Sequence, residues 1–298
     1  MRLSADPRAG WAALAFTIAV WASYLVAARA AVTTSFTPVE LGLMRFLPGA
    51  VLFVPLLWRR GLRPGGARWR DVGLIAGFGG VLFVLLLTSG LRFAPVADSV
   101  IFTPAMLPVF VAGLARLIDG DRITGRRLAG LGLILAGAMA VGGWEALARG
   151  GGAWRGHLLF LGASFSWAVY TLAYRRSGLG ATDSAAIMCF WTSLAFLPLA
   201  LITGVDFLRG GWGPLALHGT LQGLFSGFLA TLSFLVAITR LGPGTVAPFA
   251  ALVPGLAALG AWAILDEPVG AVKLAGLAVV SLGVALASGA LAPRRQRL

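Results

Sequence analysis

The sequence predicts an all-α integral membrane protein with ten transmembrane helices, arranged as two inverted five-helix repeats around a central cavity. Of the 298 residues, 58% are hydrophobic and only 12% are charged, whereas about a quarter of a soluble domain is charged. The chain also matches itself at a shift of 146 residues, which pairs Trp21 with Trp167 and Arg29 with Arg175. An odd number of spans in each half places the second half upside down in the bilayer.

The self-match extends along most of the chain. Without adjustment, the same shift lays RRLAGLGLILAG from Arg126 over VKLAGLAVVSLG from Val272. One offset that holds over such a length indicates duplication of a structural unit. We therefore expect a first repeat at 1–147 and a second, inverted repeat at 153–292, joined by a short glycine-rich connection.

Ten hydrophobic stretches are long enough to be spans, because a helix needs about 20 apolar residues to cross the hydrocarbon core. Turn signals rich in glycine and proline separate them. The stretches lie near 10–30, 38–58, 71–91, 95–118, 125–144, 156–174, 184–204, 215–238, 243–265 and 269–291.

The distribution of basic residues predicts the orientation. With both termini in the cytoplasm, 17 of the 24 basic residues lie on the inner side and six, including Lys273, on the outer side, while Arg45 lies within a span. This bias follows the positive-inside rule. The basic residues are 23 arginines and one lysine, which suggests a GC-rich bacterial genome, so we expect a multi-pass protein of the bacterial inner membrane. Because the charges occupy short loops, no nucleic-acid partner is expected.

Three motifs carry a resemblance to a known family. The second span begins with an early arginine in LMRFLPGAVLF, and ILDEPVGAVKLAGLAVVSLGV from Ile264 has a counterpart in IDGDRITGRRLAGLGLILAGA from Ile118. They resemble the ten-helix EamA-type branch of the drug/metabolite transporter superfamily, although Asp121 stands where glutamate is more usual. Within it the chain is most similar to bacterial YddG-type aromatic amino-acid exporters. The resemblance implies that spans 1, 3, 4, 6, 8 and 9 surround a cavity and that spans 5 and 10 pack behind it.

The first span and its repeat partner present aromatic and hydroxyl side chains on matching helical faces. The residues are Thr17, Trp21 and Tyr24 in the first span, and Ser164, Trp167 and Tyr170 in the sixth. Aromatic rings offer apolar area, and tyrosine and tryptophan add a hydrogen-bonding group. These faces suit an amphiphilic substrate, and the competing interpretation is helix packing alone.

Prolines predict bends in two further spans, because each removes an internal helical hydrogen bond. They are Pro104 and Pro108 in the fourth span, and Pro248 and Pro254 in the ninth. Backbone groups freed in a membrane must be covered by protein or line a wet cavity. We therefore expect these prolines to act as gating hinges, or alternatively as structural kinks. The neighbouring substrate-contact candidates are Ser99, Phe102, Thr103 and Phe249, with Phe83 in the third span and Ser226 in the eighth.

Charged residues within the spans are few, and we expect structural roles for them. Arg45 lies about two turns into the second span, where it could snorkel outward, pair with Glu40 or cap carbonyl groups. Asp98 lies near the outer start of the fourth span, where it could pair with Arg92 or Arg45, or help gate the outer mouth. No carboxylate is visible at midspan.

The remaining polar residues predict neither catalysis nor metal binding. His157 and His218 lie at span ends and are expected at the membrane interface, and the turn Asp266-Glu267 is expected to cap the last helix. No zinc-ligand motif or nucleotide loop is present. The single cysteine, Cys189, excludes an intrachain disulfide.

These observations predict a secondary transporter that exports neutral hydrophobic or aromatic amino acids and related metabolites by alternating access. One alternative is an exporter of lipophilic or quaternary cationic drugs, which aromatic faces would hold. A second is a membrane enzyme or receptor on a repeat scaffold. The leading prediction includes no catalytic residue, metal or cofactor. Its partners are a small-molecule substrate and the lipid bilayer, and the sequence is compatible with a monomer.

Overall fold

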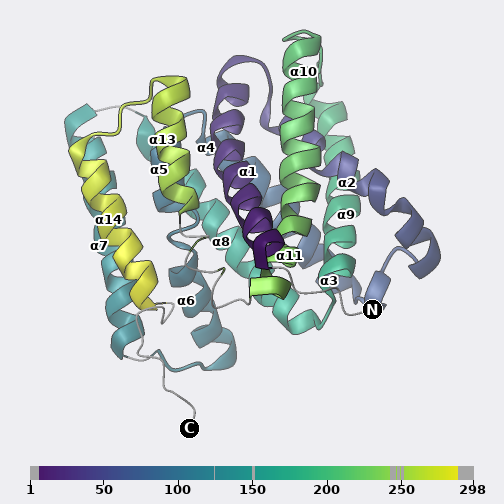
Figure 1. Cartoon of the computed structure of the whole chain (residues 1–298), viewed down its shortest axis with the longest axis horizontal. Coiled ribbons are helices and arrows are strands. Elements are labelled where there is room, and N and C mark those ends of the chain that lie inside the picture. Colours follow the sequence, from purple (N-terminus) through teal and green to yellow (C-terminus); the bar gives the residue numbers. More distant parts are fainter. Residues whose placement is uncertain are drawn as a thin grey trace.

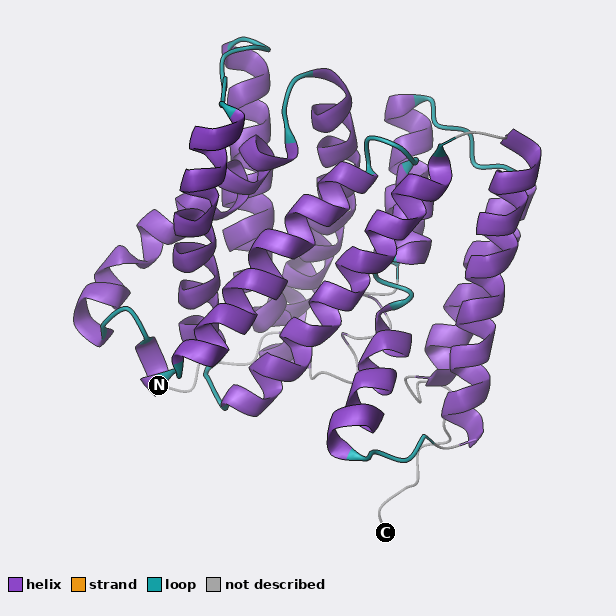
Figure 2. Cartoon of the chain, turned by 180° about the vertical axis from the view of Figure 1, so that it is seen from behind, coloured by secondary structure: helices purple, strands orange, loops and turns teal. Residues whose placement is uncertain are grey.

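The computed structural model describes residues 7–123, 125–149, 152–241, 246, 249 and 252–287, and every regular element in these residues is helical (Figures 1 and 2). The elements are α1 (Pro7–Thr34), α2 (Pro38–Arg60), η1 (Pro64–Gly66), α3 (Trp69–Leu74), η2 (Ile75–Leu82), α4 (Phe83–Gly90), α5 (Val96–Phe102), α6 (Leu107–Asp119), α7 (Gly125–Arg149), α8 (Ala153–Ser177), α9 (Ala181–Thr203), α10 (Trp212–His218), η3 (Gly219–Leu229), α11 (Ala230–Leu241), α13 (Val253–Leu265) and α14 (Ala271–Ala287). Eight helical segments are long and apolar enough to cross a membrane, and α13 and α14 are shorter apolar helices. The all-helical membrane class is thereby confirmed.

The first eight predicted stretches agree with the observed segments to within a few residues. The third stretch is continuous through α3, η2 and α4, and the eighth through α10, η3 and α11. The fourth is interrupted at 103–106, between α5 and α6. Of the ninth, the structure describes α13, Val246, Phe249 and Leu252, and the predicted hinge Pro248 lies outside the described residues.

The two halves correspond helix by helix, but at two offsets rather than one. The starts of α1 and α8, of α6 and α13, and of α7 and α14 are each 146 residues apart. The starts of α2 and α9, and of α3 and α10, are 143 apart, because α8 with 25 residues is three shorter than α1 with 28. The smaller offset pairs the internal prolines Pro55 and Pro198 of α2 and α9.

The offset returns to 146 by the starts of α6 and α13, and one contribution comes from a pair of π-helices of unequal length. η2 has eight residues and η3 has 11, and they occupy corresponding places in the third and eighth spans. A π-helix leaves backbone carbonyls poorly satisfied and is frequent at functional sites. Neighbouring hydroxyls bond two of those in η2: Ser166 Oγ donates to the Phe78 carbonyl at 2.6 Å, and Thr192 Oγ1 to the Ala76 carbonyl at 3.2 Å.

Helices of one half pack mainly against helices of the other. α1 packs against α11 and α13, and its counterpart α8 packs against α4 and α6 in the reciprocal arrangement. α2 packs against η3, and α9 against η2. The core therefore forms between the halves, with α1 and α8 each surrounded by several neighbours (Figure 1).

Two pairs of corresponding helices run antiparallel in direct contact. α7 and α14 stand side by side at one edge of the molecule (Figures 1 and 2). Gly130 approaches Gly283 and Ala287 so closely that an added Cβ would lie 2.5 Å from the Ala287 backbone nitrogen, and Gly137 approaches Gly276 and Val280 in turn. α2 meets α9 in the same way, through Gly42 against Phe196 and Gly49 against Cys189. Small residues allow this close approach in lipid.

Candidate functional site

A ladder of aromatic rings follows one face of α8. The Phe83 ring of α4 lies 4.5 Å from Trp167, which lies 4.8 Å from Tyr170, and Tyr170 stacks on Tyr174 at 6.2 Å. All four rings are half-buried although α8 is a central helix. The structure thus brings together three of the predicted contact residues, Phe83, Trp167 and Tyr170, in one semi-exposed surface.

The predicted face of α1 forms a second, separate group. Trp21 packs on Phe234 of α11 at 5.0 Å. Thr17 is fully buried, and its hydroxyl contacts the carbonyls of Ala13 at 2.9 Å and Ala230 at 3.3 Å. The Thr17 side chain therefore joins α1 to α11, which leaves Trp21 as the semi-exposed member of this pair.

Arg45, which was expected to have a structural role, lies against the predicted contact residue Tyr24. Its guanidinium lies 4.2 Å from the centroid of the Tyr24 ring, and its Nη1 donates to Ser226 Oγ at 3.2 Å. The approach depends on η3, where Gly223 and Gly227 lie against the carbonyls of Met44 and Arg45. The predicted residues Tyr24 and Ser226 therefore meet around a charge that the sequence placed inside a span.

The suggested pairing of Arg45 with Glu40 is wrong. Glu40 is fully buried and closes a capping box at the start of α2, accepting from the Thr37 backbone nitrogen at 2.7 Å. Its other oxygen accepts from the Asp206 backbone nitrogen at 2.6 Å. Since these backbone donors satisfy the Glu40 carboxylate, it tethers the 204–211 connection to α2 and leaves Arg45 to other partners.

The interruption of the fourth span is held by α8. Thr103 leaves the helical region with φ −108° and ψ −80°. Its carbonyl accepts from Ser164 Oγ at 2.8 Å, and its hydroxyl donates to the Phe160 carbonyl at 3.3 Å. Ser164 thus satisfies a carbonyl that the break releases, and the Thr103 hydroxyl adds a second bond from the break to α8.

The other predicted residues near the break are also engaged. Ser99 is fully buried and bonds the Val96 carbonyl at 2.7 Å within its own turn, and Phe102 stacks on His157 at 4.4 Å. Phe249, predicted to face the fourth span, instead packs edge-on against Trp11 near the start of α1, at 5.1 Å. Pro254 lies in the first turn of α13.

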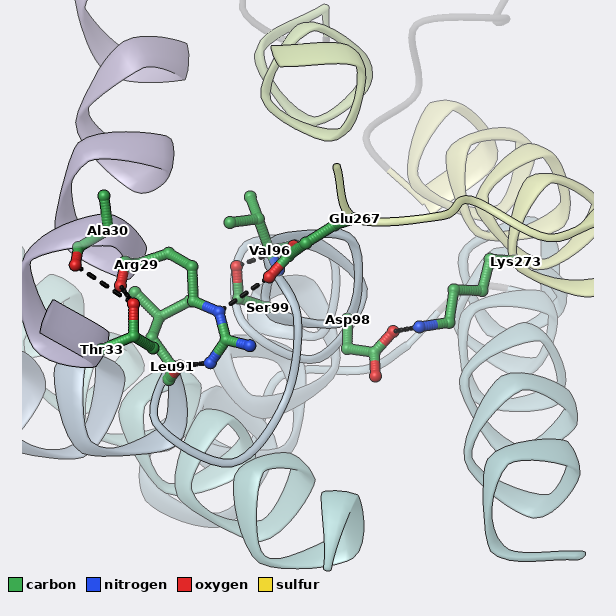
Figure 3. A network of polar contacts seen from close by, with 9 residues as sticks. All are labelled: Arg29, Ala30, Thr33, Leu91, Val96, Asp98, Ser99, Glu267 and Lys273. Carbon is green, nitrogen blue, oxygen red and sulfur yellow. Dashed lines mark hydrogen bonds and ion pairs between the residues drawn. The ribbon is translucent and has the colours of Figure 1, made fainter. Parts of the chain in front are cut away.

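A buried charge cluster joins four helices at one end of the molecule. Lys273 Nζ of α14 lies 2.7 Å from Asp98 Oδ1 of α5 and 3.0 Å from Glu145 Oε1 of α7. His157 Nε2 of α8 lies 2.9 Å from the second oxygen of Asp98. All four side chains are buried. Figure 3 shows Lys273 reaching across to Asp98.

This cluster corrects three expectations. Lys273 is not a loop charge, Asp98 does not pair with Arg92 or Arg45, and His157 is buried inside the protein, in contact with Asp98. His218 is likewise buried, beside Phe36. The sequence did carry one signal that went unused, because Lys273 is the single lysine among 24 basic residues. A lysine in a chain that otherwise uses arginine, at the start of a span, marks a selected position.

A second charged group ties down the start of α5. Arg29 Nε lies 2.7 Å from Glu267 Oε1, and Glu267 Oε2 accepts from the Val96 backbone nitrogen at 2.9 Å (Figure 3). Arg29 also donates to the Leu91 carbonyl. Glu267 therefore caps α5, whereas the sequence had suggested that it caps the last helix. Asp266 ends α13 in the left-handed conformation at φ 54°.

Two open hollows among the described residues do not coincide with the predicted set. One, of about 420 Å³, lies between α5, α7 and α8, and Phe102 is its one predicted lining residue; His157 also lines it. The other, of about 220 Å³, lies at the end of α1 and is also lined by Arg92 and Arg209. No group of three or more metal-ligating side chains occurs in the described part of the chain.

Comparisons with known proteins bear on the whole chain. The sequence model of a family described as the EamA-like transporter family matches residues 9–143 and again 154–289. A solved crystal structure, described only as that of a protein, has 20% identity and a TM-score of 0.59, over 94% of this chain and 96% of its own. At that identity it supports the fold alone. A comparison with curated proteins found no match.

Proposed function

The chain belongs to the EamA-like transporter family, and from that premise we propose that it exports neutral hydrophobic or aromatic amino acids and related metabolites by alternating access. Membership makes it a multi-pass membrane transporter of small molecules rather than an enzyme. The observation that carries the choice of substrate is the half-buried ladder of Phe83, Trp167, Tyr170 and Tyr174 on a central helix. Such rings suit an apolar or aromatic side chain.

The position of Arg45 favours this substrate class over lipophilic cations. Cations bind aromatic faces when those faces are free, but the Tyr24 face already holds the Arg45 guanidinium at 4.2 Å. A cationic substrate beside it would meet like-charge repulsion, which is a means of discrimination between ligands. In the described residues the ladder carries no carboxylate that would offset this repulsion.

The architecture we propose is two inverted five-helix repeats, 1–147 and 153–292, in the bacterial inner membrane with both termini cytoplasmic. The corresponding helices α2 and α9 lie antiparallel, as do α7 and α14, which supports the inversion. The interruption at 103–106, which contains Pro104 and is followed by Pro108, is suited to bend as a gate between the two access states, and Pro254 occupies the corresponding place in the first turn of α13.

Cysteine labelling in intact cells tests this topology. In a Cys189→Ala background, Gly213→Cys at the start of α10 should react with a membrane-impermeant thiol reagent, and Arg59→Cys at the end of α2 should not. Both positions are exposed, and no side chain would crowd a cysteine at Gly213. Permeabilised cells give the control, because both variants should then be labelled. Labelling of Arg59→Cys alone in intact cells would reverse the orientation.

Counterflow in proteoliposomes tests the substrate class. Purified protein loaded with unlabelled amino acid should accumulate the labelled amino acid, most strongly for phenylalanine, tryptophan and leucine. Quaternary ammonium compounds should compete weakly, because they would approach Arg45. Strong counterflow of quaternary cations without any for amino acids would replace the proposal with the drug-export alternative.

The aromatic ladder has its own prediction. Trp167→Ala should lower phenylalanine transport relative to alanine transport by roughly three- to tenfold, because only an aromatic substrate gains ring stacking of about 0.5–1.5 kcal/mol. Initial uptake of both substrates and the melting temperature in detergent are the measurements. Trp154→Ala is the control, since Trp154 lies on the same helix but is exposed and makes none of the ring contacts of the ladder. Equal losses for both substrates, in step with melting temperature, would make Trp167 a packing residue.

A further inference from the structure

Arg45 is a cation inside a span that has no anionic partner among the described residues. No carboxylate of the described residues lies within ion-pair distance of its guanidinium, whose contacts are the Tyr24 ring and Ser226. A charge held within a membrane segment is costly and is usually paired or functional. The two acidic residues nearest in sequence, Glu40 and Asp71, are engaged elsewhere. A ligand that carries a negative charge could therefore supply the counter-charge that Arg45 lacks among the described residues.

Two polar side chains on helices next to Arg45 lack hydrogen-bond partners in the part of the chain that the structure describes. The Tyr24 hydroxyl and Gln222 Nε2 are both buried and have no hydrogen-bond partner in the described residues. Gln222 lies four residues before Ser226 on the π-helix η3. Buried polar groups are normally satisfied, so unsatisfied ones call for an explanation. The Arg45 guanidinium and the hydroxyl of the Tyr24 ring on which it lies are donors suited to a carboxylate, and Gln222 adds an unsatisfied amide on the same π-helix as Ser226.

The corresponding place in the second half is apolar. The 143-residue offset between α2 and α9 pairs Arg45 with Met188, and the 146-residue offset between α1 and α8 pairs Tyr24 with Tyr170. Met188 and Tyr170 are indeed neighbours, since the Met188 methyl and the Tyr170 ring both lie within 3 Å of a Cβ built on Gly79. The two pseudo-equivalent positions therefore differ by one charge, with Arg45 beside Tyr24 and Met188 beside Tyr170.

We propose that Arg45 binds the carboxylate of the transported molecule, and that Met188 and Tyr170 receive its apolar end. The inference rests on the proposed function and sharpens it, because it requires a carboxylate and not merely an aromatic side chain. The planar guanidinium can take a carboxylate through two parallel hydrogen bonds while the Tyr24 ring holds its face. This difference between the halves would then set the orientation of an amphiphilic substrate, with its carboxylate at Arg45 and its apolar end at Met188 and Tyr170.

Competition between matched compounds tests the carboxylate requirement. In counterflow of labelled phenylalanine, unlabelled phenylalanine and 3-phenylpropionate should compete, while phenylalaninamide, which lacks the carboxylate, should compete at least tenfold more weakly. In Arg45→Met the half-maximal concentration of phenylalanine should rise roughly 10- to 100-fold, which is the loss of one hydrogen-bonded charge interaction. The preference for acid over amide should disappear. Arg59→Met, which removes an exposed arginine of the same helix, should leave the preference unchanged.

The strength of competition by the acids relative to the amide distinguishes a loss of carboxylate binding from a loss of folded protein. Arg45→Lys should keep part of the preference, because a point charge remains but two-point geometry is lost; this variant decides the matter if Arg45→Met does not fold. An unchanged ratio in the folded variants would overturn the proposal. If wild-type protein transports no amino acid, 3-phenylpropionate should still raise the melting temperature of wild type but not of Arg45→Met. Equal shifts in the two proteins would overturn the Arg45 site independently of the proposed function.

Discussion

Replacing Lys273 with methionine should cost the protein most of its stability. The substitution leaves Asp98 and Glu145 buried together without their cation, which lies 2.7 Å from one and 3.0 Å from the other. Removing one partner from a buried ion pair destabilises proteins by about 3–5 kcal/mol, because a buried charge is left uncompensated. We expect a large fall in melting temperature in detergent and little correctly inserted protein.

A compensating variant separates charge from packing. Lys273→Met combined with Asp98→Asn and Glu145→Gln removes all three charges and retains the shapes, so it should recover much of the lost stability. Arg92→Met removes an exposed basic residue at the same end of the molecule and should change the melting temperature little. If the triple variant is no more stable than Lys273→Met alone, the cluster acts through shape rather than charge.

Substituting leucine for Gly130 should separate α7 from α14. A Cβ at this position would lie 2.5 Å from the Ala287 backbone nitrogen and 2.7 Å from the Gly283 carbonyl oxygen. Backbone atoms cannot rotate out of the way as a flexible side chain can, so the helices themselves must move apart. Overpacking typically costs about 1–3 kcal/mol even in cores that adjust by side-chain movement, and we expect a larger loss here.

Gly132 provides a control from the same helix. It lies two residues away, and a Cβ there would meet no atom within 4 Å. Gly132→Leu should therefore insert and melt like the wild type, while Gly130→Leu should show low yield and a depressed melting temperature. Equal behaviour of the two variants would mean that α7 and α14 do not meet at Gly130.

The sequence predicted most of the helical architecture because its signals are local. Hydrophobic length located the spans, and the matching of Trp21 with Trp167 predicted corresponding helices. The change of offset from 146 to 143 was not predicted, because an unadjusted shift hides length changes that compensate one another. One is the shorter α8, and the others lie between the starts of α10 and α13, where the longer π-helix η3 contributes three residues. The π-helices are stabilised by hydrogen bonds from neighbouring helices to their carbonyl groups, and such tertiary contacts cannot be predicted from the hydropathy of the sequence.

The charged residues were harder to place than the aromatic ones. Trp167 and Tyr170 lie three residues apart on one helix, so their proximity follows from helical geometry. Lys273 and Asp98 are 175 residues apart, and their contact depends on how α5 and α14 pack. Charge counting treats each basic residue near a span end as a loop residue, which is why Lys273 was assigned to the outer surface. The prolines did predict the interruption near Thr103, because proline acts on its own helix.

The lysine cluster also sets an order for membrane insertion. Asp98 and Glu145 belong to the first half of the chain, and Lys273 is synthesised 128 residues after Glu145. At translation rates of about 5–20 residues per second, this delay lasts roughly 6–25 s. During that time the first five hydrophobic stretches are already available for insertion, but the contacts that Lys273 makes with two of their carboxylates have not yet formed. Nascent chains that stop before Lys273 should therefore be strong substrates for membrane proteases.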